Sequence, residues 1–217
     1  MNKNEIMDAL NFRHSCKEFD ESKKISEANF EVILEGGRLS PSSMGIEPWK
    51  FLVIENQELK NELGAVSWGG KVQMPTCSHL VVYLSRSAKE LRFDSNYIDY
   101  LLKDVKQIPE DVASNYKGVM KSIEEIRFEE DKDIEAYASE QVHIALGNMM
   151  NVAASLEIDS CPIGGIDRNA VEKILVNRGL LDTDKFNIAV CAAFGYRVNE
   201  PGKKLRQTMD KVVTWVK

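Results

Sequence analysis

The sequence contains few of the residues that build metal centres or disulfide frameworks. Its three histidines lie far apart and form no H-x-x-x-H pair. Its four cysteines are also scattered, and no two of them form a C-x-x-C motif. The residues concerned are His14, His79, His143, Cys16, Cys77, Cys161 and Cys191. We therefore expect no dedicated metal site and no disulfide framework, with the cysteines reduced in the core or in loops.

Long apolar runs and an excess of positive charge are absent as well. No apolar run approaches the length of a transmembrane helix, and the N-terminus M-N-K-N-E-I-M-D lacks the basic-then-apolar order of a signal peptide. The net charge of −6 and the pI near 5.3 argue against nucleic acid as the main partner. We expect a cytoplasmic protein with no membrane or nucleic-acid partner, in which any bound anion is held by a local cluster of positive charge.

Several well-known catalytic motifs are missing from the chain. There is no G-x-G-x-x-G behind a strand, no P-loop and no G-x-S-x-G elbow, and nothing places a base beside a serine. The acidic run E-E-I-R-F-E-E-D is typical of a solvated helix face rather than of an acid/base pair. The chain offers hydrogen-bond donors and glycines rather than a nucleophile, which fits a protein whose bound cofactor performs the reaction.

The apolar fraction of 43% and the spacing of apolar residues predict one globular domain of the α+β class. Strands are predicted at 49–54, 79–85 and 186–194, and a short one in the terminal V-V-T-W-V. Helices are predicted after caps at Asn4, Ser26, Asn56 and Asp167, and over 96–106, 112–128 and 134–156. The segment C-P-I-G-G is predicted to be a tight loop. Because the strands are widely separated and show no regular βαβ alternation, a purely parallel sheet is not expected.

Two parts of the chain stand out from this pattern. The segment 86–133 is charged and weakly patterned, and it is expected to form a helical excursion at the periphery. The helix over 134–156 carries a seam of small and adaptable residues at steps of three and four. This seam suits either a core helix that packs within its own subunit or a helix that also meets its symmetry mate in a dimer.

Two basic clusters lie at opposite ends of this acidic chain. The first contains Arg13 and Lys17, and the second contains Lys203, Lys204 and Arg206. Either cluster alone is typical of solvated surface charge. If the fold brings them together, their guanidinium and ammonium groups form a phosphate clamp, to which the hydroxyl of residue 15 can contribute.

Two small-residue segments allow a ligand to come close to the backbone. Ser42 and Ser43 suit the edge of a planar ligand, although P-S-S alone is also a simple turn. Gly164 and Gly165 let backbone N–H groups approach a ligand with no Cβ in the way, although a glycine pair before a helix is commonly only a loop.

Taken together, five motifs resemble the FMN-dependent nitroreductase family, which includes oxygen-insensitive NAD(P)H nitroreductases and flavin reductase-like proteins. They occur in the family's order and at comparable spacings over nearly the whole chain. They are R-H-S-C-K-E-F, S-P-S-S-M-G-I-E-P-W-K-F, P-I-G-G-I-D, G-Y-R and the terminal K-x-R. The resemblance implies an α+β sandwich in which helices flank a central, mostly antiparallel sheet. It also implies an intertwined homodimer with two FMN molecules at the interface and a C-terminal arm, at about 199–217, wrapped over the partner.

The resemblance further implies a set of cofactor-binding residues. The residues expected to hold the FMN phosphate are Arg13, Ser15, Lys204 and Arg206, with His14 contributing through its backbone. The residues expected at the flavin ring are Lys17, Gln141, Pro162, Ile163, Gly164 and Gly165. The residues expected to come from the other subunit are Pro41, Ser42 and Ser43, and Gly45 is also expected to belong to the cofactor site. No side chain is expected to be catalytic by itself, since FMN carries the chemistry, while Lys17 stabilises charge on the ring and the backbone of Gly164 faces N5.

The implied activity is a ping-pong, two-electron hydride transfer from NAD(P)H through FMN N5 to a nitroaromatic, quinone or similar small acceptor. Two alternatives remain open: a protein that binds or senses FMN and turns over poorly, and a relative specialised for another flavin reaction such as dehalogenation or ring cleavage. Many relatives carry Asn at Gly45, Gln at Glu47, Asn at Gly70, Lys at Gln73 and an acidic residue at Gly164. These departures leave fewer side-chain donors for the pyrimidine edge and bear mainly on the choice of acceptor.

Overall fold

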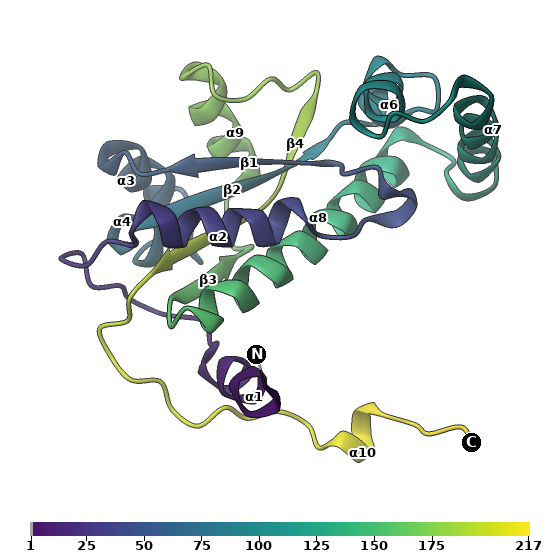
Figure 1. Ribbon diagram of the computed structural model, residues 1–217. Coiled ribbons are helices and arrows are strands. Elements are labelled where there is room, and N and C mark those ends of the chain that lie inside the picture. Colours follow the sequence, from purple (N-terminus) through teal and green to yellow (C-terminus); the bar gives the residue numbers. More distant parts are fainter. Residues whose placement is uncertain (1) are drawn as a thin grey trace.

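The computed structural model describes residues 2–217 and has a four-stranded sheet at its centre (Figure 1). The strands are β1 (Trp49–Ile54), β2 (His79–Arg86), β3 (Asp159–Ile163) and β4 (Phe186–Gly195). Their order in the sheet is β1-β2-β4-β3, and every neighbouring pair is antiparallel. The predicted α+β class and mostly antiparallel sheet are therefore confirmed.

Helices cover both faces of this sheet and form an extension at one end of it (Figure 1). The α-helices are α1 (Lys3–Phe12), α2 (Glu27–Arg38), α3 (Gln57–Ala65), α4 (Gln73–Thr76), α5 (Ala88–Leu91), α6 (Asn96–Tyr100), α7 (Glu110–Arg127), α8 (Asp131–Ser155), α9 (Arg168–Asn177) and α10 (Met209–Val212). A 3-10 turn, η1, spans Ser43–Gly45, and a π-helical segment, η2, spans Leu101–Val105. None of the helices in residues 2–217 is both long enough and apolar enough to cross a membrane.

The long helix α8 packs with α2 against one face of the sheet. Its small residues let the two helices approach closely: a Cβ on Gly36 would lie 2.7 Å from a methyl carbon of Val152, and a Cβ on Gly37 would lie 2.6 Å from the sulfur of Met149. The two glycines, in the last turn of α2, therefore serve helix packing. Tyr83 of β2 joins the same core, and its hydroxyl donates to the Met149 sulfur at 3.1 Å.

The opposite face of the sheet is covered by α3, α4 and α9. Its core contains fully buried side chains such as Leu63, Met74, Val171 and Leu175. Burying an aliphatic side chain of this size contributes about 1.5–3 kcal/mol to the free energy of unfolding. The cores on the two faces therefore both stabilise the sheet.

Most of the predicted helix starts are confirmed. The side chains of Ser26, Asn56 and Asp167 accept hydrogen bonds from backbone N–H groups in the first turns of α2, α3 and α9. The predicted cap at Asn4 is wrong, because Asn2 caps α1 and Glu5 reaches back to the Asn2 N–H in a capping box.

Two local predictions are also wrong. The segment expected as a tight loop, C-P-I-G-G, contributes its first three residues to β3, which pairs with β4 at an edge of the sheet. Pro162 is tolerated there because an edge strand has one side without ladder hydrogen bonds. The terminal V-V-T-W-V forms no strand, because α10 ends at Val212 and no regular element follows it in the described chain.

The segment 86–133 forms a helical extension (Figure 1), and its small core also includes Ile46 from the loop before β1 and Ile134 and Ala138 from α8. The helix predicted over 96–106 is divided into α6 and η2, and the helix predicted over 112–128 begins at Glu110 as α7. Two tyrosines of this extension, Tyr97 and Tyr116, donate their hydroxyls to the backbone of the loop that precedes β1. The extension therefore packs against a loop that carries several predicted site residues.

Candidate functional site

The two basic clusters, which are almost 190 residues apart in sequence, lie together in the structure. The segment that follows α1 runs beside β3, where the N–H of Cys16 donates to the carbonyl of Ser160 at 3.1 Å. The segment that follows β4 runs past it on the other side, and the N–H of Val198 donates to the carbonyl of Glu18 at 3.3 Å. The chain therefore meets the condition on which a phosphate clamp depended.

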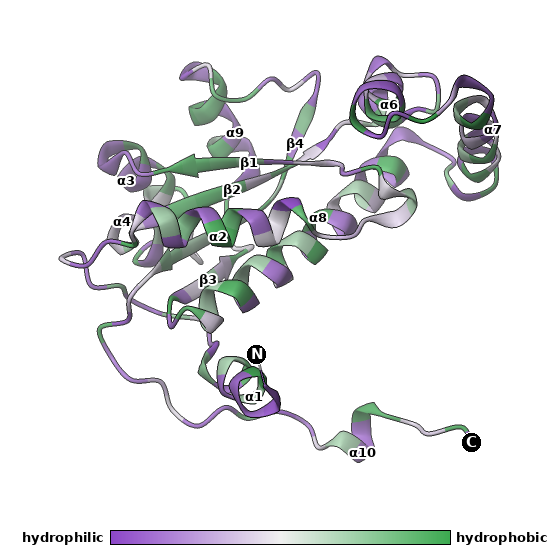
Figure 2. Ribbon diagram, in the orientation of Figure 1, coloured by the Kyte–Doolittle hydropathy of each residue, from purple (hydrophilic) through white to green (hydrophobic). Residues whose placement is uncertain are grey.

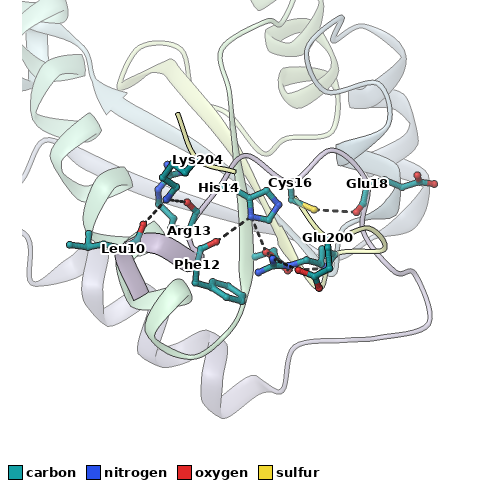
Figure 3. Close-up of polar contacts among 10 residues, drawn as sticks. Leu10, Phe12, Arg13, His14, Cys16, Glu18, Glu200 and Lys204 are labelled. Atoms are coloured by element: carbon teal, nitrogen blue, oxygen red, sulfur yellow. Dashed lines mark hydrogen bonds and ion pairs between the residues drawn. The ribbon is translucent and has the colours of Figure 1, made fainter. Parts of the chain in front are cut away.

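Lys204 joins the two clusters directly (Figure 3). Its Nζ donates to the backbone carbonyl of Leu10 at 2.5 Å and to the carbonyl of Arg13. Partial burial lowers the pKa of Lys204 below its usual value, and the positive charges of Arg13 and Arg206 lower this pKa further. Three cationic groups are thus close enough to oppose one another's charge.

No carboxylate offsets this cluster within the described part of the chain. Between residues 2 and 217, neither Arg13, Lys204 nor Arg206 forms an ion pair with an acidic side chain, and the same is true of Lys17. A group of positive charges without a negative partner is a favourable site for an anion, since charge-assisted bonds to an anion relieve the repulsion.

Two adjoining hollows lie between the segments. One has a volume of about 390 Å³ and lies against the terminal basic cluster, and the other, of about 260 Å³, extends toward Lys17. Both are lined by His14, Ser15, Pro201 and Gly202. We call these two hollows together the recess; the terminal basic cluster lines one of them and Lys17 lines the other.

A buried ion pair that the sequence did not reveal supports this recess. Asp159, at the start of β3, is 3% exposed and binds Arg197, whose Nε lies 3.0 Å from the carboxylate and whose backbone N–H donates to it at 2.9 Å. His14 Nδ1 lies 3.5 Å from the same carboxylate, and the Arg197 guanidinium stacks over the ring of Phe12 at 4.1 Å. The motif G-Y-R contained Arg197, but its acidic partner could not be assigned without the fold.

Within R-H-S-C-K, the side chains divide between the recess and the core. Cys16 is 1% exposed, its thiol donates to the carbonyl of Glu18 at 3.1 Å, and burial raises its pKa to about 11. Lys17 is exposed, and its charge partly offsets the burial that raises the pKa of Cys161 in β3. The ammonium of Lys17 therefore lies near β3, whereas Cys16 is a core residue, as expected.

The end of β3 offers one open backbone position. Gly164 is exposed, and a Cβ built on it would meet nothing within 4 Å. Gly165 instead serves packing, since a Cβ there would lie 2.7 Å from the indole nitrogen of Trp68. Pro162 is half-buried, but Ile163 is 1% exposed, so the side chain of Ile163 belongs to the core rather than to a ligand face.

The remaining predicted site residues lie elsewhere in this chain, near the middle of α8. The N–H of Ser43 donates to the side-chain oxygen of Gln141 at 2.8 Å, and the hydroxyl of Ser42 accepts from the N–H of Glu47 at 2.9 Å. Gln141 is 13 residues from Ala154, a residue of α8 beside α1, which corresponds to about 20 Å along a helix. One chain therefore does not join Pro41, Ser42, Ser43, Gly45 and Gln141 to its own basic cluster.

This antiparallel sheet, covered on one face by a long helix, is the fold of the nitroreductases, and the chain belongs to the Nitroreductase family, whose model matches residues 10–196. A candidate NAD(P)H nitroreductase from Bacillus subtilis, YfkO, is 47% identical over 99% of this chain and 98% of its own. A relative from Staphylococcus saprophyticus, also a candidate NAD(P)H nitroreductase, is 44% identical over 97% of this chain and 96% of its own.

Solved structures share the fold at lower identity. A nitroreductase-like protein from Streptococcus mutans superposes with a TM-score of 0.84 at 16% identity, with both chains covered completely. A candidate nitroreductase from Exiguobacterium sibiricum, solved in complex with FMN, superposes with a TM-score of 0.78 at 21% identity and 97% coverage of both chains. The family suggested by the five motifs and the predicted fold are thus confirmed.

Proposed function

We propose that this protein is an FMN-dependent NAD(P)H oxidoreductase that reduces small, flat, electron-poor acceptors such as nitroaromatics or quinones. The observation that carries the proposal is the cluster of Arg13, Lys204 and Arg206, in which three positive charges lie close together beside a recess lined by Lys204 and Arg206 and have no acidic partner in residues 2–217. The family of the chain and the FMN bound to the Exiguobacterium protein support the same conclusion.

The residues at the recess fit the phosphate end of FMN. Guanidinium and ammonium groups bind phosphoryl oxygens through charge-assisted hydrogen bonds, and Ser15 adds a hydroxyl at the same wall. Lys204 already uses two of its donors on backbone carbonyls and keeps one for a ligand. A bound phosphate would also raise the lowered pKa of Lys204, because its negative charge opposes the effect of the two arginines.

The flavin ring would extend from this end toward Lys17 and Gly164. The ammonium of Lys17 would favour negative charge on the ring, and the open backbone at Gly164 would let an N–H group face it. When bound, FMN would supply two-electron transfer between NAD(P)H and the acceptor in a ping-pong cycle, which requires no protein nucleophile.

A homodimer is part of this proposal. Pro41, Ser42, Ser43 and Gly45 lie far from the basic cluster of their own chain, so they could complete a site only in a partner subunit. Apolar residues lie along α1 and the C-terminal segment (Figure 2), and several of their large side chains are exposed. They support such a partner, because a protein surface rarely leaves many large apolar groups in water.

FMN binding by the double variant Arg13→Ala/Arg206→Ala tests the proposal. Each charge-assisted phosphate contact contributes about 1.5–3 kcal/mol, so a titration that follows flavin fluorescence should show affinity weakened by at least about a hundredfold. Lys23→Ala/Lys185→Ala is the matched control, since it also removes two positive charges but from exposed lysines that do not line the recess. If the double variant binds FMN as the control does, the phosphate site is not where we place it.

A further inference from the structure

The loop before β1 has an unusual backbone that the helical extension holds in place. Met44, Gly45 and Glu47 have positive φ angles of 55°, 57° and 45°. For a residue with a side chain, this conformation costs about 1–2 kcal/mol. The Tyr116 hydroxyl donates to the carbonyl of Met44, and the Tyr97 hydroxyl lies 2.8 Å from the carbonyls of both Ile46 and Glu47. The extension thus stabilises the strained loop that carries the predicted site residues.

The extension also brings a positive charge to the centre of this loop. A Cβ built on Gly45 would lie 2.6 Å from the Nζ of Lys106, so the ammonium occupies the place that a side chain at position 45 would need. Lys106 directly follows the π-helical segment η2, and its N–H donates to the carbonyl of Leu101 at 2.9 Å. Single π-helical turns are frequent at functional sites, where they redirect the residues beside them.

Lys106 is half-buried and has no anionic partner. In the described residues 2–217, its ammonium forms no ion pair and no hydrogen bond, and its ring neighbour Tyr116 lies 6.0 Å away. Lys103, one turn earlier on the same segment, behaves as an ordinary surface lysine: it is exposed and lies 3.6 Å from Glu110. An ammonium that is held against a ligand-facing loop and left unpaired is poised for an anionic or electron-rich group.

We propose that Lys106 is a flavin-contact residue that supplies, from the helical extension, the donor missing at Gly45. This inference rests on the proposed FMN site, in which the loop of one subunit lies against the flavin of the other. The reduced flavin carries negative charge that the oxidised form lacks, so a nearby ammonium strengthens binding of the reduced form more than that of the oxidised form. Gly45 is then an adaptation that makes room for the lysine.

The test compares Lys106→Met with Lys103→Met, which removes the same charge from the same segment. We expect Lys106→Met to bind reduced FMN about tenfold more weakly relative to oxidised FMN, which corresponds to a midpoint potential about 30 mV lower for a two-electron couple. Lys103→Met should retain the wild-type potential, and Lys106→Arg should retain most of the effect of the positive charge. Thermal unfolding of each apoprotein reports whether the substitution disturbs the fold.

The outcomes separate this inference from the proposed function. If the wild-type protein binds FMN through Arg13 and Arg206, and Lys106→Met matches Lys103→Met in affinity and potential, the role of Lys106 is wrong and the FMN site stands. If the wild-type protein binds no FMN, the proposed function fails and this inference fails with it.

Discussion

Neighbouring residues of one short stretch have opposite environments. His14 and Ser15 line the recess, whereas Cys16 between Ser15 and Lys17 is buried in the core. Burial raises the pKa of Cys16 to about 11 and that of Cys77 to about 12. Cys16 therefore belongs to the core, which is one of the two environments expected for the cysteines of this chain.

Because the thiols are buried, we expect them to react slowly with disulfide reagents and to make the free energy of unfolding depend on pH. With a pKa near 11, only about 0.1% of Cys16 is thiolate at pH 8, so native protein should react with a disulfide reagent far more slowly than protein in urea. The unfolded thiols ionise near pH 9, whereas the folded ones do not, so the free energy of unfolding should fall as the pH rises from 9 toward 11. Rapid labelling of all four cysteines in the native state would contradict this account.

The positions of most elements followed from local sequence, whereas their junctions did not. Helix caps at Ser26, Asn56 and Asp167 are encoded by side chains that bond to the next turn, and they could be recognised from composition alone. The strand β3 was not predicted, because Pro162 is compatible with a strand only at a sheet edge and the edge position depends on the whole fold. The ion pair of Asp159 and Arg197 could not be predicted either, because only the whole fold brings these two residues together.

That ion pair connects β3, the recess and the segment after β4, so we expect it to be important for stability. Asp159→Asn removes the buried carboxylate from Arg197, which is 13% exposed and keeps only the exposed Glu200 as a counter-charge, and should cost about 3 kcal/mol in the free energy of unfolding. Glu200→Gln is the control, since Glu200 pairs with the same arginine but is 87% exposed, and it should cost less than about 1 kcal/mol. Equal midpoints in urea for the two variants would show that the buried carboxylate of Asp159 adds no more to the free energy of unfolding than the exposed carboxylate of Glu200.

The candidate site could likewise be predicted only in part. The motifs identified the basic groups, and the fold brought Arg13 and Lys204 together as the phosphate clamp required. The contribution of the 86–133 segment could not be predicted, because the contacts of Tyr97, Tyr116 and Lys106 with the loop before β1 join residues fifty or more positions apart without any recognisable motif.

At the scale of the whole molecule, the most distinctive feature is the set of large apolar side chains left exposed in a single chain. Large apolar side chains are exposed on α1 and on the segment that leads away from the sheet past α10. They are Ile6, Met7, Leu10, Leu205, Met209, Val212, Trp215 and Val216. A second copy of the chain that receives this segment would cover them and would also bring the loop before β1 to the basic cluster.

The homodimer that we propose should therefore depend on the C-terminal segment. Replacing Val212 and Trp215 together by Glu should weaken self-association by about a hundredfold or more in analytical ultracentrifugation, because each side chain loses its apolar burial. Lys211→Glu, an acidic change at an exposed polar position of the same segment, should leave the dimer intact. A double variant that sediments like wild type would contradict a role for this segment in assembly.

The central claim is that the two basic clusters form the phosphate end of an FMN site in an NAD(P)H oxidoreductase. The visible spectrum of the purified protein, reconstituted with FMN and recorded without oxygen before and after NADH or NADPH, tests it most directly. The account predicts a bound-flavin spectrum that bleaches when one of the nicotinamides is added and returns with an acceptor. A protein that cannot be reconstituted with FMN would contradict the cofactor site, and a flavin that neither nicotinamide reduces would indicate a protein that binds or senses FMN instead.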